Sequence, residues 1–125
     1  MIRQLVSVLG GLVLLASCAG ARPVSEIATG LSEFDIDLSH PLAAGGDLTL
    51  ELANVGELPH TIVISAADGK VVAASDVSQS ETTATFSVTL EPGEYEFTCR
   101  IVAEFDGALL DHFELGMVES VTVSG

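Results

Sequence analysis

Apolar and polar residues alternate along most of this 125-residue chain, and this period of two is the feature that most constrains its fold. Phe34, Ile36 and Leu38, for example, alternate with acidic residues. Because successive side chains of a strand point to opposite faces, this pattern is typical of half-buried β-strands. It recurs in residues 47–53, 60–64, 71–72, 84–90, 95–99 and 121–123, with turn signals such as Gly45-Gly46, Asp68-Gly69 and Pro92-Gly93 between them. Seven or so short strands at this spacing predict an all-β protein, either an antiparallel β-sandwich or a small barrel.

The first 17 residues have a different pattern, which is typical of a signal peptide. An apolar run from Leu5 to Ala16 follows Arg3, and it is shorter than the roughly 20 residues that a membrane span requires. The run ends in Leu15-Ala16-Ser17-Cys18, which resembles the bacterial lipobox. That resemblance implies cleavage of residues 1–17 and lipidation of Cys18. In an ordinary signal peptide, Cys18 would instead be a chance residue near the cleavage site.

Composition divides the rest of the chain into a tether and one domain. Residues 18–32 are small, polar and weakly patterned, so we expect a lipidated tether there. Residues 33–125 are long enough to bury one core without disulfides. The chain has 18 acidic and 4 basic residues, for a formal net charge of −14. This charge argues against nucleic-acid binding, and it suits either basic protein partners or a saline habitat.

Four residues of the expected domain have the side chains that a soft metal site requires. His60 begins one expected strand and Cys99 ends another, while His112 and Met117 lie just before the last strand. A thiolate, two imidazoles and a thioether suit copper. The alternative is structural, with Cys99 as a small core residue, His60 as a strand-end histidine and Met117 as a core filler. We interpret the third histidine of the chain, His40, as a surface residue because it precedes a proline in a turn.

The motifs around these residues make the chain similar to a cupredoxin, the blue-copper family of plastocyanin, azurin and halocyanin. They follow one another in the order Asn54-Val55-Gly56, Pro59-His60, Pro92-Gly93-Glu94-Tyr95-Glu96-Phe97-Thr98-Cys99, His112 to Met117, and Val121-Thr122-Val123. The resemblance covers residues 33–125 and implies an antiparallel Greek-key β-sandwich with one copper ion. It further implies that His60, Cys99 and His112 are equatorial ligands, that Met117 is the axial ligand, and that the Thr61 N–H donates to the thiolate.

The main departure from the family pattern is the segment between Cys99 and His112. Twelve residues separate the two ligands, whereas single-domain cupredoxins usually have two to four. We expect a short helical turn around residues 108–113 and a functional loop that covers the edge of His112, the usual route for electrons in the family. One consequence of this longer loop would be a perturbed copper site with a red or green spectrum.

The resemblance implies an electron carrier that is anchored by lipid in the cell envelope, with its domain facing the periplasm or the cell exterior. Its partners would be a cytochrome or a membrane oxidase or reductase. We expect no enzymatic activity, because the neighbours of Cys99 are Thr98 and Arg100 and no His-x-His pair is available for a second copper. The competing hypothesis is a metal-free β-sandwich lipoprotein that binds a protein partner through Leu109, Leu110 and Phe113.

Overall fold

A computed structural model describes residues 21–125, which form eleven β-strands. The expected signal peptide, residues 1–17, and the expected lipidation at Cys18 lie outside the described residues. Among residues 21–125 there is no helix that is long and apolar enough to cross a membrane. The strands are β1 (Glu26–Ser32), β2 (Asp35–Leu38), β3 (Leu42–Ala44), β4 (Gly46–Asn54), β5 (Val63–Ala66), β6 (Val71–Ala74), β7 (Thr83–Leu90), β8 (Gly93–Thr98), β9 (Val102–Phe105), β10 (Ala108–Asp111) and β11 (Val118–Ser124).

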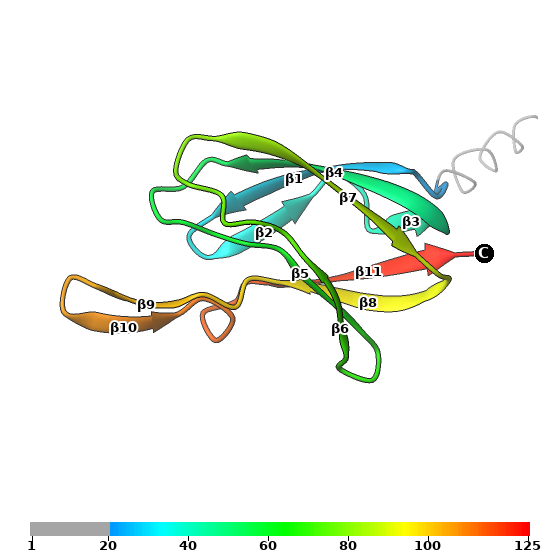
Figure 1. The fold of residues 1–125 in the computed structure, drawn as a ribbon. Coiled ribbons are helices and arrows are strands. Elements are labelled where there is room, and N and C mark those ends of the chain that lie inside the picture. Colours follow the sequence, from blue (N-terminus) through cyan, green and yellow to red (C-terminus); the bar gives the residue numbers. More distant parts are fainter. Residues whose placement is uncertain (1–20) are drawn as a thin grey trace, which may run out of the picture.

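Two sheets form the layers of a β-sandwich (Figure 1). The first has the strand order β2-β1-β4-β7 and the second has the order β3-β11-β8-β5-β6. The all-β sandwich is as predicted. However, β1 pairs with β4 and β3 pairs with β11 in parallel, so the expectation of purely antiparallel sheets was wrong for these two pairs. Parallel neighbours need a crossover between them, and alternation within a strand carries no information about strand direction.

The core lies between the sheets and follows the alternation. Leu48, Leu50 and Leu52 of β4 are buried, and Phe97 of β8 and Val121 of β11 are buried on the facing sheet. Full burial of one such side chain contributes about 1.5–3 kcal/mol relative to exposure. The pattern therefore fixes which face of each strand points inward.

The domain begins earlier than the sequence predicted. Residues 26–32, assigned to the tether, form β1, which pairs with both β2 and β4. Ile27 and Leu31 are fully buried. The inward face of this strand also contains Thr29, whose hydroxyl donates a 3.5 Å hydrogen bond to the Ile27 carbonyl. A polar residue on the core face concealed the alternation.

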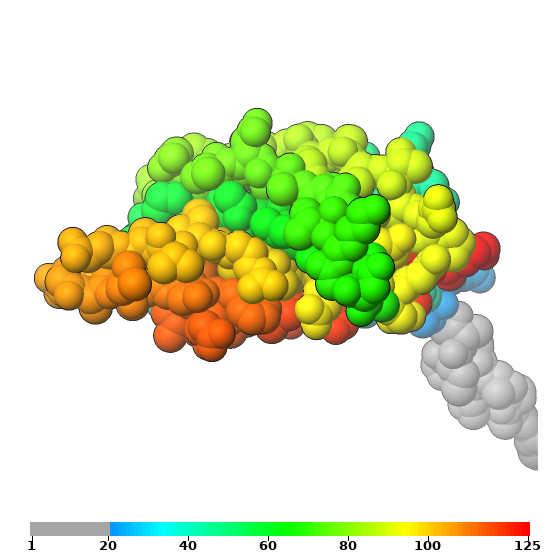
Figure 2. All heavy atoms as spheres, turned by 60° about the horizontal axis from the view of Figure 1, so that its bottom comes forward, coloured from blue at the N-terminus to red at the C-terminus, as the bar shows by residue number. Residues whose placement is uncertain are grey.

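The long segment after Cys99 is a β-hairpin in which β9 and β10 pair antiparallel. The expectation of a helical turn around residues 108–113 was wrong for β10, and a hydrogen-bonded turn follows the strand, in which the Leu115 N–H donates to the Asp111 carbonyl at 3.1 Å. The turn of the hairpin is Asp106-Gly107, with φ of 53° and 81°. Asp-Gly favours the two-residue turn in which both φ values are positive. The hairpin extends from the sandwich at the end opposite to the C-terminus (Figure 1) and projects beyond the rest of the molecule (Figure 2).

Candidate metal centre

His60 is held by its backbone and by one ring nitrogen. Its N–H donates to the Ser78 carbonyl at 3.1 Å and its carbonyl accepts from the Ser78 N–H at 2.8 Å. The residue is fully buried. Nε2 lies 2.7 Å from the carboxylate of Glu33, whereas Nδ1 is buried and has no hydrogen-bond partner among the described residues.

The loop that leads to His60 is shaped by Asn54, at the end of β4. Its side-chain N–H groups donate to the carbonyls of Leu58 and Ser78, both at 2.9 Å. Its side-chain oxygen accepts the Gly56 N–H at 2.9 Å. Because Asn54 is buried, these bonds satisfy polar groups that would otherwise be left unpaired. The Asn-x-Gly motif therefore sets the path of the chain into the first candidate ligand.

Cys99 follows β8 and is fully buried. Its Sγ lies 3.5 Å from the Thr61 backbone nitrogen, 3.8 Å from the Thr61 Oγ1 and 3.5 Å from Nδ1 of His112. It forms no disulfide within residues 21–125. The expected donation from the Thr61 N–H to the sulfur is present.

Backbone hydrogen bonds place His112 and Met117 beside Cys99. The Met117 N–H donates to the His112 carbonyl at 3.1 Å, and the Cys99 N–H donates to the Met117 carbonyl at 3.2 Å. The chain reverses at Gly116, whose φ of 117° favours glycine. Met117 is fully buried and His112 is 2% exposed. The Phe34 ring packs against the edge of the His112 ring, with centroids 5.0 Å apart.

Together these contacts bring three candidate ligands into one buried cluster. One potential ligand atom from each of His60, Cys99 and His112 lies within 4.8 Å of the others. An unpartnered nitrogen in a dry interior is unfavourable, so the buried Nδ1 of His60 fits a site built to hold a metal ion. One thiolate and two imidazoles form a donor set for a soft metal. His40 is exposed and bonds to Ser39, away from this cluster.

In the metal-free cluster, neighbouring groups raise the pKa of His60 and lower the pKa of Cys99. Burial lowers the pKa of His60, but the neighbouring Cys99 and Glu33 outweigh burial and raise it above the ordinary value. Burial raises the pKa of Cys99, yet His60 and the N–H groups of Ile101 and Thr61 bring it below the ordinary value. Burial and the charge of His60 lower the pKa of His112. A thiolate is the form of cysteine that binds metal.

Glu33 is the part of the site that the sequence did not reveal. Partial burial raises the pKa of Glu33, but hydrogen bonds from the Glu57 N–H and from His60 outweigh burial, so the net shift of this pKa is downward. It precedes Phe34 in an alternating stretch, where it resembled the outward acid of a strand. No spacing rule connects it with His60, 27 residues later. The hairpin did have a signal, the Asp106-Gly107 turn between apolar residues.

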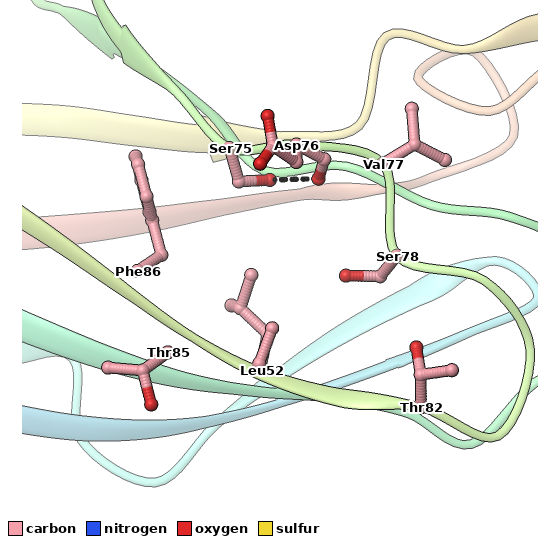
Figure 3. Close-up of a pocket in the computed structure, with 9 residues that line it drawn as sticks. Leu52, Ser75, Asp76, Val77, Ser78, Thr82, Thr85 and Phe86 are labelled. Carbon is pink, nitrogen blue, oxygen red and sulfur yellow. Dashed lines mark hydrogen bonds between the residues drawn. The ribbon is translucent and has the colours of Figure 1, made fainter.

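Of the clefts on the described surface, one lies away from the cluster and another includes the cluster residue His112. One is lined by Leu52 and Phe86 together with the polar segment Ser75–Ser78, where the Ser75 hydroxyl bonds to the Asp76 carbonyl (Figure 3). Asp76 is the only titratable residue that lines this cleft. The other cleft lies beside the cluster and is mostly apolar. It is lined by Leu58, Pro59, Ile101, Ala103, Glu104, Phe105, Leu110 and His112.

Comparison with solved structures identifies the fold. No protein-family model and no curated protein matches the chain. The dithionite-reduced auracyanin of Roseiflexus castenholzii is 19% identical, with a TM-score of 0.65 over 83% of this chain and 100% of that chain. A purple cupredoxin of Nitrosopumilus maritimus is 21% identical, with a TM-score of 0.50 over 81% and 100%. An amicyanin variant in the Cu(I) state is 14% identical, with a TM-score of 0.53 over 80% and 83%.

These likenesses define the class of protein by its architecture. The chain has the cupredoxin fold, as the ordered motifs predicted. Within that fold, the described residues form a buried His-Cys-His cluster at the base of the β9–β10 hairpin, because Cys99 precedes this hairpin and His112 follows it.

Proposed function

We propose that this protein holds one copper ion and carries single electrons in the cell envelope. The observation that carries the proposal is the convergence of His60, Cys99 and His112, whose potential ligand atoms lie within 4.8 Å of one another. The amicyanin described with Cu(I) and the auracyanin described as reduced, both of the same fold, support it. When bound, copper supplies a Cu(I)/Cu(II) one-electron couple.

In this proposal the chain's own residues keep the site nearly the same in both oxidation states. His60, Cys99 and His112, together with Met117, would hold the ion in a mononuclear type 1 site. The Thr61 N–H, 3.5 Å from Sγ, stabilises the thiolate. All four side chains are buried, and backbone hydrogen bonds join Cys99 to Met117 and Met117 to His112, while the backbone of His60 is held by Ser78. Little rearrangement would therefore accompany electron transfer.

The apolar cleft beside His112 is the proposed contact surface for redox partners. Phe105 is 55% exposed, and the cleft that it lines reaches the His112 ring. The hairpin itself carries Glu104, Asp106 and Asp111 and has no basic residue. An acidic rim around an apolar contact suits a basic cytochrome or a basic docking face of a membrane oxidase or reductase. We propose no catalytic activity of its own.

Lipid anchoring completes the proposal and rests on the lipobox-like residues before Cys18. The described chain begins at the end of the sandwich opposite to the hairpin (Figure 1). A lipid at Cys18 would therefore leave the metal end facing away from the membrane. In the envelope this orientation would make the site accessible to partners in the periplasm or outside the cell.

Copper stoichiometry tests the proposed function. Native mass spectrometry of the purified protein after Cu(I) loading should show one ion per chain, and voltammetry should show a reversible one-electron couple. Cys99→Ser, which removes the thiolate but preserves side-chain shape, should abolish both signals. The matched control His40→Ala should leave both unchanged, since His40 is exposed. Full binding by the Cys99→Ser variant would contradict the proposal.

A further inference from the structure

We infer that Glu33 is a positioning residue that holds His60 in one tautomer, directs its Nδ1 to the metal and lowers the reduction potential of the site. The inference rests on the proposed function and extends it to a residue outside the ligand set. Its basis is a cradle around the Glu33 carboxylate, formed by the loop that leads to His60.

Both carboxylate oxygens of Glu33 are engaged in this cradle. Oε1 accepts the Glu57 N–H at 2.7 Å, while Oε2 accepts the Leu58 N–H at 3.4 Å and lies 2.7 Å from His60 Nε2. Two backbone donors from the same loop fix the orientation of the carboxylate, and its side chain is 27% exposed. The carboxylate is therefore a fixed acceptor placed against one ring nitrogen.

Gly56 provides the space for the carboxylate. A Cβ added at Gly56 would overlap both carboxylate oxygens and the carbon that carries them. The Asn54 side chain holds Gly56 in place through its N–H. The Asn-x-Gly motif thus creates a pocket for the Glu33 side chain as well as a turn.

The cradle also joins the two layers of the sandwich. Glu33 lies in the connection between β1 and β2 of the first sheet, whereas His60 precedes β5 of the second. The 2.7 Å contact between their side chains links these layers at the metal end. Movement of the His60 ring is thereby limited by a group outside its own sheet.

The contact has a defined chemical consequence. An ionised carboxylate only accepts hydrogen bonds, so Nε2 must carry a proton, and in the neutral ring Nδ1 is then left free to bind metal. A carboxylate on the far side of a ligating imidazole also makes the ring a stronger donor. Its negative charge stabilises Cu(II) more than Cu(I), because the charge difference between these ions is one unit. Glu33 therefore lowers the reduction potential.

Glu33→Gln tests the inference because it keeps the shape of the side chain and removes its charge. Loss of an outer partner of a ligating histidine typically costs 10–100-fold in metal affinity. We expect Cu(II) affinity to fall about tenfold more than Cu(I) affinity, which corresponds to a rise in potential of about 59 mV for one electron. The matched control is Glu57→Gln, which removes one exposed charge nearby and retains the backbone N–H that binds Glu33.

A second readout needs no metal. In ¹⁵N NMR spectra of the metal-free protein with a neutral ring, His60 should carry its proton on Nε2. Glu33→Gln should give a detectable Nδ1–H tautomer, and Gly56→Ala should do the same by displacing the carboxylate. If the wild-type protein bound no copper, the proposed function would fail while this test of Glu33 remained. An unchanged tautomer together with an unchanged potential, or an equal shift in Glu57→Gln, would overturn the inference.

Discussion

Asn54 and Glu33 both bind the same short loop through hydrogen bonds, and together they determine where the His60 ring lies. Asn54 holds the loop through the Leu58 carbonyl and the Gly56 N–H. Glu33 binds the loop through two further N–H groups. Neither residue is a candidate ligand, yet the position of His60 depends on both. The candidate site is therefore larger than the set of side chains that would touch a metal.

Asn54→Ala tests this view of the loop through stability. The substitution removes three hydrogen bonds of the Asn54 side chain, one of them buried, to Ser78, and two partly buried, to Leu58 and Gly56. An unsatisfied buried polar group costs about 1–3 kcal/mol, so we expect the free energy of unfolding to fall by at least about 2 kcal/mol. Urea denaturation measures this change. Thr89→Ala, which loses an exposed hydrogen bond to Asp47, is the control and should change stability by about 0.5 kcal/mol or less. A similar small change in both variants would contradict the role of Asn54.

Among individual residues, the sequence predicted those with distinctive chemistry and missed those with ordinary chemistry. Three of the four proposed ligands meet in one buried cluster, because thiol and imidazole groups stand out and strand alternation indicates their facing direction. Met117 is buried beside them, and its ligand role stays a prediction. Glu33 was missed because an acid among alternating acids looks like a solvent-facing residue. Only the fold brings it to His60.

Among the elements, the β9–β10 hairpin most distinguishes this chain. Its two strands pair only with each other, and most of its residues are exposed. The His112 N–H donates to the Ile101 carbonyl at 3.0 Å and so closes the base of the hairpin. The two sheets therefore do not depend on residues 102–111 for their own pairing. The hairpin is an addition whose residues line a cleft together with His112.

Replacing residues 102–111 with Asn-Gly tests that independence. The pair favours a tight two-residue turn between Ile101 and His112, and the shorter loop changes closure entropy by only about 1 kcal/mol. We expect cooperative unfolding to be preserved and the metal-free protein's His112 to react faster with diethyl pyrocarbonate. The reaction of His40, which is already exposed, serves as the internal control and should not change. Loss of cooperative unfolding, or an unchanged His112 rate, would contradict this description.

The elements were partly predictable for identifiable reasons. Strands with clean alternation, such as β4, were located within one residue of their ends. β1 was missed because Thr29 interrupts its apolar face, and the hairpin was missed because its strands are exposed and have no buried side. Alternation detects strands with a core face. It does not detect a strand whose two faces are both exposed to solvent, or one that has a polar residue on its inward face.

For the whole molecule, the ordered motifs and the number of expected strands were sufficient to predict a sandwich. They did not predict the parallel pairs β1–β4 and β3–β11, because strand direction depends on connections that alternation does not encode. The net charge of −14 spans the whole chain, with acids on both sheets and on the hairpin. Such a charge affects solubility and encounters with partners more than it affects the fold. The His-Cys-His cluster lies at one end of this acidic protein.

The proposed function requires that Cys99 bind copper as a thiolate in a trigonal site. Optical and electron paramagnetic resonance spectra of the Cu(II)-loaded protein measure this directly. We predict an intense sulfur-to-copper charge-transfer band and a small parallel hyperfine splitting, with the band absent from Cys99→Ser. Because His60, Cys99 and His112 are buried and Phe34 packs against the His112 ring, the spectrum should not change when small anions are added. A weak tetragonal signal with no thiolate band, or no copper binding, would contradict the central claim.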